Sequence, residues 1–325
     1  MKALRVTILS AISALSLVVV ACSQPAPATP TQAPAKAAEP TKAAASAATS
    51  TTAAASSTAP SKAAEPTKAA APATKVVYPE KGKAISFIVQ YAPGGGSDVA
   101  ARVLAPLMEK DLGTPVQVVN KEGAGGQVGF TAMTTSKPDG YTIGWVVLPT
   151  VITTYLDPER KAVFSRKSFD LIGMHDMDPG IVAVRSDSPY KTMKDLVEAA
   201  KKNPEKIRAC TAGILSDDHI AILKTEQLSG AKFAVVNMDG SAAGRTALLG
   251  GHIEAFYGNQ SELTSQVKSG DVRLLAIFDK KRSAYYPDVP TAEEQGYKIE
   301  GGVHHGLALP AGAPKEVFDA LVKAH

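Results

Sequence analysis

Short apolar runs alternate with amphipathic segments through most of the chain after residue 76. The apolar runs predict strands at Ile85–Gln90, Val116–Val119, Thr142–Val147, Ile181–Val184, Ile207–Cys210, Ala234–Val236, Ile253–Tyr257 and Leu274–Ile277. The amphipathic segments predict helices at Asp98–Leu112, Gln127–Ser136, Met193–Lys202, Asp217–Leu228, Ser241–Leu249 and Ser261–Lys268. Alternation of strand and helix is typical of an α/β protein with largely parallel sheets, and about 250 residues suffice for two domains.

The predicted helix Asp98–Leu112 carries an apolar stripe. Four apolar side chains recur at helical spacing and three more widen the stripe: Val99, Val103, Leu107 and Leu112, with Ala100, Leu104 and Met108. This spacing predicts an amphipathic helix with that apolar face.

The first residues are typical of an export signal. Lys2 and Arg5 precede an apolar run, Thr7–Ala21, that is short for a membrane span. The run ends in "VVVACS", which resembles the lipobox of bacterial lipoproteins and implies that Cys22 is lipidated. An ordinary signal peptide or a short membrane anchor is the alternative.

Residues 23–75 consist almost entirely of Ala, Pro, Thr, Ser and Lys, and the sequence "KAAEPTKAAA" occurs twice. Such a segment has too little bulky apolar surface to offset its ordering entropy, which predicts a disordered tether. As a flexible coil it would reach on the order of 40 Å. A tether suits a folded part that works away from a membrane but is held to it.

Charge and cysteine content narrow the function classes. Residues 1–75 carry seven Lys or Arg and two Glu, a net of +5, so the chain's net charge of +4 leaves about −1 for the rest. No overall basic field remains to suggest nucleic-acid binding. If Cys22 carries lipid, Cys210 has no partner within the chain and is most simply a small buried side chain.

The stretch "YAPGGGSDVA" places three glycines between a predicted strand and a predicted helix. Ligands of open α/β sheets bind at the carboxyl ends of strands, and a helix start offers free N–H groups that suit an anion. The glycines at 94–96 let a ligand approach the backbone, and Ser97 or Asp98 could cap the helix. A tight turn without a ligand is the alternative, whereas the lack of Lys-Ser/Thr and of a third fingerprint glycine disfavours a nucleotide site.

Three further junctions also contain glycine and few bulky side chains: "NKEGAGGQVG", "TAGILSDDHIA" and "NMDGSAAGR". Each lies between a predicted strand and a predicted helix. Four such junctions indicate loops that converge on one small anionic ligand.

Three longer stretches of the sequence resemble a known family. "YAPGGGSDVAARVLAPLMEKDLGTPVQVVNKEGAGGQVGFTAMTTSKPDGYTI", "TALLGGHIEAFY" and "YYPDVPTAEEQGY…GLALPAGAPKEV" resemble the receptors of tripartite tricarboxylate transporters, also called the Bug family. The resemblance covers nearly all of residues 78–325. It implies an extracytoplasmic receptor, periplasmic or on the outer face of the plasma membrane, that binds a small di- or tricarboxylate or aromatic acid and delivers it to a membrane permease.

The resemblance also implies a type II-like periplasmic-binding-protein fold, with two α/β domains closing on a ligand between them. The first domain would comprise residues 76–184, the second residues 185–300, and residues 301–325 would return to the first. The two crossings would act as hinges. Relatives continue beyond the position of His325, so the chain is expected to lack helices that complete the first domain.

The ligand-binding residues implied by the resemblance come from both domains. They are Tyr91, Ala92, Gly94, Gly95, Gly96, Ser97, Asp98, Ala124, Gly125, Gly126, Leu148, Pro149, Thr150, Gly213, Ser216, His219, Asp239, Gly240, Ser241 and Asn259.

The chain departs from the family pattern where a second carboxylate would bind. Leu215 replaces a glycine, and Asp217 and Asp218 add negative charge, which disfavours a second carboxylate unless these aspartates only cap the helix. Asp239 could bind an amino or hydroxyl group, and Arg245 could pair with it or with a ligand carboxylate. The identity of the ligand is therefore open.

The sequence indicates neither an enzyme nor a metal or cofactor site. None of the six histidines has zinc-like spacing, and the adjacent His304 and His305 would face opposite sides of a strand. Ser97 with a distant histidine would suit a hydrolase, but the Gly-x-Ser-x-Gly elbow is absent. A binding module that reports ligand to a membrane sensor, without transport, remains the main alternative to a transport receptor.

Overall fold

The computed structural model describes residues 77–325. The predicted signal peptide, the lipidation of Cys22 and the tether lie outside the described residues. Within residues 77–325, no helix has the length and apolar character needed to cross a membrane.

The first of two lobes, lobe 1, is built on strands β1 (Ile85–Val89), β2 (Val116–Asn120), β3 (Thr142–Leu148) and β9 (Gly302–Pro310) and on the first half of β4 (Phe169–Arg185). β1 pairs in parallel with β2 and β3, and β9 runs antiparallel to both β3 and β4. Its helices are α1 (Gly96–Leu112), α2 (Gln127–Thr134), α3 (Thr150–Leu156) and α8 (Lys315–Ala324), with 3₁₀ turns η1 (Ala124–Gly126), η2 (Pro158–Arg160) and η3 (Arg166–Ser168).

Lobe 2 continues from the second half of β4. Its strands are β5 (Arg208–Thr211), β6 (Ala234–Asn237), β7 (Ala255–Asn259) and β8 (Val272–Phe278). β5 pairs in parallel with β6 and β7, whereas β4 is antiparallel to β7 and β8. Its helices are α4 (Met193–Lys202), α5 (Asp217–Ser229), α6 (Ser241–Leu249) and α7 (Thr264–Ser269), with η4 (Gln260–Leu263) and η5 (Glu293–Gln295).

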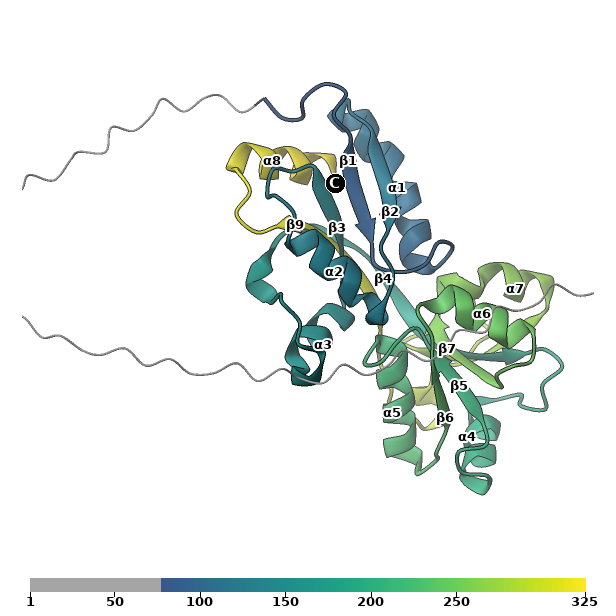
Figure 1. Cartoon of the computed structure of the whole chain (residues 1–325). Helices are drawn as coiled ribbons and strands as arrows, with labels where there is room; N and C mark the ends of the chain where they lie inside the picture. Colours follow the sequence, from purple (N-terminus) through teal and green to yellow (C-terminus); the bar gives the residue numbers. More distant parts are fainter. Residues whose placement is uncertain (1–76) are drawn as a thin grey trace, which may run out of the picture. The chain divides into compact units, whose positions relative to one another are not determined.

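β4 belongs to both lobes and joins them (Figure 1). Its residues up to Pro179 pair with β9, and its residues from Gly180 onward pair with β7 and β8. The chain returns at Gly301 and Gly302, where the Gly180 N–H donates to the Gly301 carbonyl at 2.9 Å. The two strand segments at this crossing therefore lie side by side.

The prediction of largely parallel sheets was wrong for the centre of the structure. β9 and the first half of β4 were not predicted as strands, and both are antiparallel to their neighbours. Their sequences mix apolar, charged and glycine residues, as in "FDLIGMHDMDPG", so neither the alternation nor the apolar run of a strand is clear. Long-range pairing, rather than local preference, makes them strands.

The predicted helices are confirmed, and most of their boundaries agree within two residues. Met193–Lys202 and Ser241–Leu249 are found as predicted, while Ser261–Lys268 is divided between η4 and α7. α3 and α8 were not among the predictions. Cys210 is buried and free, as expected.

The apolar stripe of α1 was partly wrong. Leu104 and Met108 are buried, but Val99, Val103 and Leu107 are more than half exposed. The buried face instead uses Ala101 and Ala105 beside Leu104 and Met108. Small alanine side chains let α1 lie close to the sheet, and the bulkier valines then point outward.

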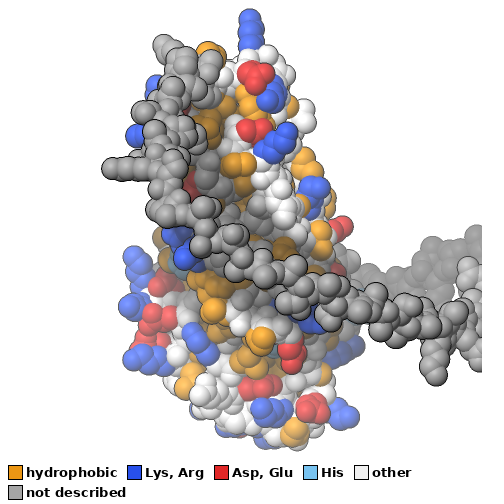
Figure 2. Space-filling model, turned by 60° about the vertical axis from the view of Figure 1, so that its left-hand side comes forward, with side chains coloured by type: hydrophobic (Ala, Val, Ile, Leu, Met, Phe, Trp, Pro, Cys, Tyr) orange, Lys and Arg blue, Asp and Glu red, His pale blue; other side chains and the backbone are white. Residues whose placement is uncertain are grey.

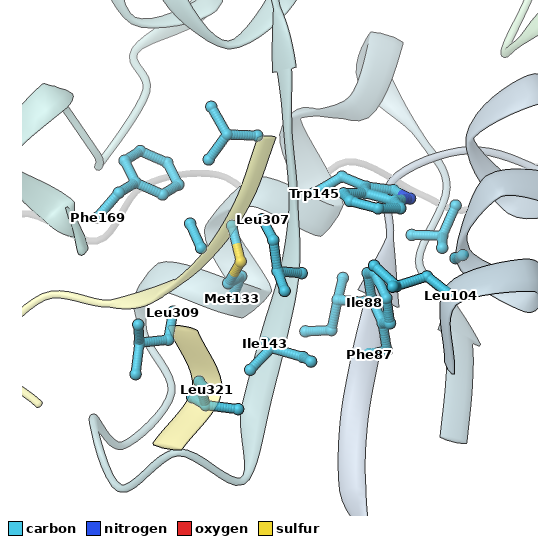
Figure 3. Close-up of a cluster of buried hydrophobic side chains, with 14 of the residues drawn as sticks. Phe87, Ile88, Leu104, Met133, Ile143, Trp145, Phe169, Leu307, Leu309 and Leu321 are labelled. Carbon is cyan, nitrogen blue, oxygen red and sulfur yellow. The ribbon is translucent and has the colours of Figure 1, made fainter. Parts of the chain in front are cut away.

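The core of lobe 1 lies between its sheet and helices (Figure 3). It includes Phe87, Leu104, Met133, Trp145 and Leu321, all at most 4% exposed. α8 contributes Leu321, so the last helix covers part of this core. Trp145 lies edge-on to Phe87, with ring centroids 4.8 Å apart.

Lobe 2 has apolar clusters on both faces of its sheet. Val182 and Val184 of β4 belong to one cluster, and Ile181 and Ala183 belong to the other. Alternate side chains of a strand point to opposite faces, so this run is apolar at every position because helices cover both sides.

Charged side chains of both signs are interspersed over the face drawn in Figure 2. This distribution agrees with the small net charge of residues 76–325. No field of a single sign is visible on that face.

We expect Leu104→Ala to destabilise the fold by about 2–5 kcal/mol, because it leaves a cavity under α1. The neighbouring Val103→Ala is the matched control and should change stability by less than about 0.5 kcal/mol, since Val103 is exposed. Urea unfolding followed by circular dichroism measures both. Equal losses in the two variants would contradict the observed orientation of α1.

Candidate functional site

A cleft of about 850 Å³ is lined by residues of both lobes. Lobe 1 contributes the start of α1, and lobe 2 contributes the starts of α5 and α6 together with η4. The crossing strands β4 and β9 supply further lining residues. Several polar backbone and side-chain groups therefore converge on one hollow, which is the usual form of a small-molecule site.

The start of α1 faces the cleft without a side-chain cap. Gly95 is the N-cap residue, and no side chain hydrogen-bonds there. Among the described residues, no acceptor is found for the N–H groups of Gly96 and Ser97. Gly94 precedes them with a φ of +81°, a conformation that favours glycine. The loop thus leaves two donors and the positive end of the helix free for an anion.

Asp98 holds this loop in shape rather than facing the cleft. Its carboxylate accepts the Gly94 N–H at 2.9 Å and also accepts from Arg102 and Asn120, each at 2.9 Å. Burial acts to raise the pKa of Asp98, but these hydrogen bonds hold it below its usual value. The carboxylate therefore stays ionised and fixes the loop.

The start of α6 is also uncapped. Gly240 is its N-cap residue, with a φ of +108° and no side-chain cap, and Ser241 lines the cleft. Arg245, one turn further on, donates to the carbonyls of Gly94 and Glu262, both at 3.2 Å. The guanidinium therefore links the two lobes at the cleft.

The start of α5 differs from those of α1 and α6, because a side chain of the protein caps it. Ser216 is the N-cap, and its hydroxyl accepts the His219 N–H at 3.3 Å. The cap is thus Ser216 rather than either aspartate. Asp217 accepts from the Asn259 side chain at 2.9 Å, and one oxygen of Asp218 accepts the Ala212 N–H at 3.0 Å.

Burial raises the pKa of both Asp217 and Asp218. For Asp218 the charges of Asp217 and Glu262 raise it further. Asp218 is only 3% exposed, and its second oxygen has no hydrogen-bond partner in the described structure. This end of the cleft is therefore negative or proton-bearing.

Two more carboxyl groups line the same side. Burial raises the pKa of Glu262 to about 7, and the charges of Asp178 and Asp217 contribute. Burial likewise raises the pKa of Asp178 to about 6, and the charge of Asp176 contributes. None of Asp178, Asp217, Asp218 and Glu262 forms an ion pair with a Lys or Arg of residues 77–325.

A hydrogen-bond chain joins Ser97, His305 and Asp176 at the crossing. His305 Nε2 lies 2.8 Å from Ser97 Oγ, and His305 Nδ1 lies 2.7 Å from Asp176 Oδ1. Burial acts to raise the pKa of Asp176, but the contact with His305 holds it below its usual value. The ionised Asp176 favours the His305 tautomer that carries its proton on Nδ1, which leaves Nε2 to accept from the Ser97 hydroxyl. Trp145 Nε1 donates to the Ser97 carbonyl at 2.9 Å, and this hydrogen bond from the core of lobe 1 helps to fix the position of Ser97.

The sequence did not predict the hydrogen bonds among Ser97, His305 and Asp176, because it did not predict the strands that carry His305 and Asp176. Asp176 and His305 are direct partners in the antiparallel register of β4 and β9. The expectation that His304 and His305 face opposite sides is confirmed, since His305 is 3% exposed and His304 is more open. Nothing local in "GMHDMD" or "GVHHGL" indicates that the two segments pair.

The structure brings together nine of the residues that the resemblance implied. Those lining the cleft are Tyr91, Gly94, Gly95, Gly96, Ser97, Ser216, Gly240, Ser241 and Asn259. Those outside its lining are Ala92, Asp98, Ala124, Gly125, Gly126, Leu148, Pro149, Thr150, Gly213, His219 and Asp239. The cleft also includes four acid or base side chains that were not expected there: Asp176, Asp178, Glu262 and His305.

Some of the outlying residues form a second contact between the lobes. A Cβ at Gly213 would lie 3.2 Å from the Gly125 Cα, so the two glycine loops touch. Arg160 donates to the carbonyls of Ala124 at 3.0 Å and Ile214 at 2.8 Å. These loops hold the lobes together beside the cleft.

Residues 100–325 match the family described as "TctC: Tripartite tricarboxylate transporter family receptor". The chain belongs to this receptor family. The "UPF0065 protein in gbd 5'region" of Cupriavidus necator is 32% identical over 244 residues, covering 74% of this chain and 72% of that protein.

Solved structures agree with the family. The periplasmic binding protein BugD is 34% identical, with a TM-score of 0.70 over 76% of this chain and 82% of its own. MatC of Rhodopseudomonas palustris, solved with bound malate, is 24% identical with a TM-score of 0.70, over 76% of this chain and 84% of its own, and shares the fold. The receptor thus has a periplasmic-binding-protein fold, as the resemblance implied, and the matching family and BugD are described as a receptor and a binding protein rather than as enzymes.

We expect Asp218→Asn to stabilise the receptor more at pH 8 than at pH 5, because the cost of the buried carboxyl group begins above its unfolded pKa and grows as pH rises. A carboxyl group with a raised pKa in the folded state binds more protons folded than unfolded, so its contribution to stability is lost as pH rises. Asparagine keeps the acceptor for Ala212 N–H without the charge.

The gain at pH 8 should be about 2–4 °C in melting temperature, which corresponds to about 1 kcal/mol in a domain of this size. Differential scanning calorimetry at both pH values measures the difference from the native receptor, which cancels the titration of other groups. A gain that is larger at pH 5 would contradict the raised pKa.

Proposed function

We propose that the receptor captures a small organic acid in the cleft and delivers it to membrane permease subunits of the tripartite tricarboxylate type. The folded part would work outside the cytoplasm, held to a membrane by lipid on Cys22 and by the tether of residues 23–75. Membership of the receptor family supports capture and delivery. The lipid anchor and the permease rest on the sequence resemblance.

One observation carries the carboxylate proposal. The N–H groups of Gly96 and Ser97 lie at the uncapped start of a 17-residue helix and line the cleft without an acceptor. A ligand carboxylate would accept both hydrogen bonds and meet the positive end of the helix dipole. The uncapped start of α6 at Ser241 would add a donor from the other lobe.

Contacts across the cleft support a closing motion on the ligand. Arg245 reaches the Gly94 carbonyl from lobe 2, and Thr153 Oγ1 donates to the Leu215 carbonyl at 2.9 Å. A ligand that bridges α1 and α6 would favour this closed arrangement over an open one by its differential affinity. The two strand segments at the crossing, near Gly180 and Gly301, would act as the hinge.

We expect Gly95→Val to weaken binding of the organic acid at least tenfold while the fold is retained. The backbone at Gly95 has a φ of −79°, which valine tolerates, but a Cβ would lie 3.3 Å from Ser241 Oγ. The side chain would therefore crowd the cleft and hold α6 away.

Ala284→Val is the control, because Ala284 is exposed and lies outside the lining of the cleft and away from the crossing strands. Isothermal titration calorimetry against a panel of mono-, di- and tricarboxylates and aromatic acids measures both variants. Unchanged affinity in Gly95→Val would argue against a ligand at this loop.

The chain of Ser97, His305 and Asp176 favours a second candidate function, ester hydrolysis. Its connectivity is that of a serine nucleophile, a histidine base and an orienting carboxylate, and the start of α1 offers N–H groups for an oxyanion. In a receptor the same chain would instead orient Ser97 toward the bound acid.

Ser97→Ala separates the two functions. The receptor proposal expects no turnover of p-nitrophenyl acetate by the native protein and less than about a tenfold loss of affinity for the organic acid, because alanine keeps the backbone N–H and the Ser97 hydroxyl already donates to His305. Turnover that disappears in Ser97→Ala would establish the hydrolase.

A further inference from the structure

The two sides of the cleft have opposite polarity. The starts of α1 and α6 present hydrogen-bond donors, whereas the start of α5 and η4 present carboxyl groups. This contrast limits which organic acid the site accepts, and the inference that follows rests on the proposed function.

The acidic side comprises Asp178, Asp217, Asp218 and Glu262, named here the acidic wall. All four line the cleft. They come from β4, the first turn of α5 and η4, elements that only the fold brings together. No lysine or arginine of the described chain pairs with any of them.

The cations near the cleft are engaged elsewhere or lie at its rim. The guanidinium of Arg245 donates to two backbone carbonyls, and Lys268 is exposed at the end of α7. His305 contacts Asp176 and Ser97 instead of the acidic wall. No Lys or Arg of the described residues therefore pairs with the wall, and the nearby His305 acts to lower the pKa of Asp178 and Asp217 only through its charge.

Asp218 gives an independent sign of an absent partner. The residue lines the cleft and is 3% exposed, and its Oδ1 is buried beside the carboxyl group of Asp217 without a hydrogen-bond donor among residues 77–325. A buried carboxyl oxygen without a donor is costly. A cationic ligand group beside the wall would reduce this cost through its charge.

The wall and the free N–H groups are close together. A Cβ on Gly96 would lie 3.3 Å from Glu262 Oε1, so that carboxyl group stands beside the start of α1. A second ligand carboxylate facing the wall would be repelled. An ammonium group there would be attracted while a carboxylate on the same molecule meets Gly96 and Ser97.

We propose that the ligand is a zwitterion, an organic acid that also carries an ammonium group, whose carboxylate binds the start of α1 and whose ammonium group binds the acidic wall. A metal ion is a poorer occupant, because no group of three or more His, Cys, Asp or Glu side chains in residues 77–325 is arranged to hold one. The raised pKa values of Asp178 and Glu262 agree, since a cation is the group that would keep both ionised.

The test compares ligands that differ in the group facing the wall or, for butylamine, in the carboxylate. Glutamate, 2-hydroxyglutarate and glutarate form one series, and 4-aminobutanoate, butanoate and butylamine form another. Calorimetry on the native receptor should give at least tenfold tighter binding for an amino acid than for the acid without the amino group. Equal or tighter binding of the hydroxy acid or the plain acid would overturn the inference and leave the proposed function intact.

Two variants locate the effect. Asp218→Asn and Glu262→Gln should each reduce the preference for glutamate over glutarate severalfold, and Glu316→Gln, an exposed acid on α8, should leave it unchanged. Asp218→Asn is the more informative, because asparagine keeps the acceptor for Ala212 N–H. A preference that persists in both wall variants would overturn the assignment of the ammonium group to the wall.

The preference should also depend on pH with a defined sign. As pH rises from 5.5 to 8, Asp178 and Glu262 lose protons, so the ratio of glutamate to glutarate affinity should increase. Asp176, His305, Arg245, Lys268, Tyr91, Tyr285 and Tyr286 also face the cleft. These groups act on both ligands, so taking the ratio of the two affinities reduces their influence. A ratio that falls with pH would contradict the proposal.

Failure of the proposed function would give a different calorimetry result from failure of the zwitterion proposal. If butylamine binds and no carboxylate of either series does, the wall binds cations but the carboxylate site at α1 is absent. If none of these ligands binds, the zwitterion proposal fails, and the wider panel of mono-, di- and tricarboxylates and aromatic acids decides the proposed function.

Discussion

A buried helix start must find acceptors for its first N–H groups, and this constraint organises the cleft. At α5 the protein supplies an acceptor itself, because the Ser216 side chain caps the helix. At α1 and α6 glycines occupy the N-cap positions, and no side chain forms a cap hydrogen bond with the first N–H groups. These two starts come from different lobes and face the same hollow. A ligand that satisfies both would hold the lobes together.

The support beneath α1 makes that arrangement rigid. Asp98 ties the glycine loop to the helix, and Trp145 fixes the carbonyl of Ser97 from the core. His305 and Asp176 fix the Ser97 side chain from the crossing strands. The donors at the start of α1 are thus positioned by the core of lobe 1 and by the junction between lobes. Donors that are held in place by such contacts lower the entropy cost of binding.

The acidic wall opposes this anion site. Carboxyl groups with raised pKa values and no paired cation destabilise the empty receptor as pH rises. Such strain is common where a protein recognises a charged group. Within one cleft, free N–H groups and unpaired carboxyl groups select for a ligand with both signs of charge. Membership of a receptor family leaves that selection open, because it depends on the particular side chains of α5, η4 and β4.

The sequence by itself determined the α/β class, most helices and strands, and the glycine-rich junctions that carry the helix starts, because these depend on local periodicity and on residues with special backbone freedom. Only the tertiary structure decided which face of α1 is buried, where alanines rather than valines meet the sheet. It also decided that Asp176 of β4 meets His305 of β9, and that Asp178 and Glu262 join the aspartates of α5. These contacts join residues tens to more than a hundred positions apart, and the pairing of distant strands leaves no periodic trace in either segment alone.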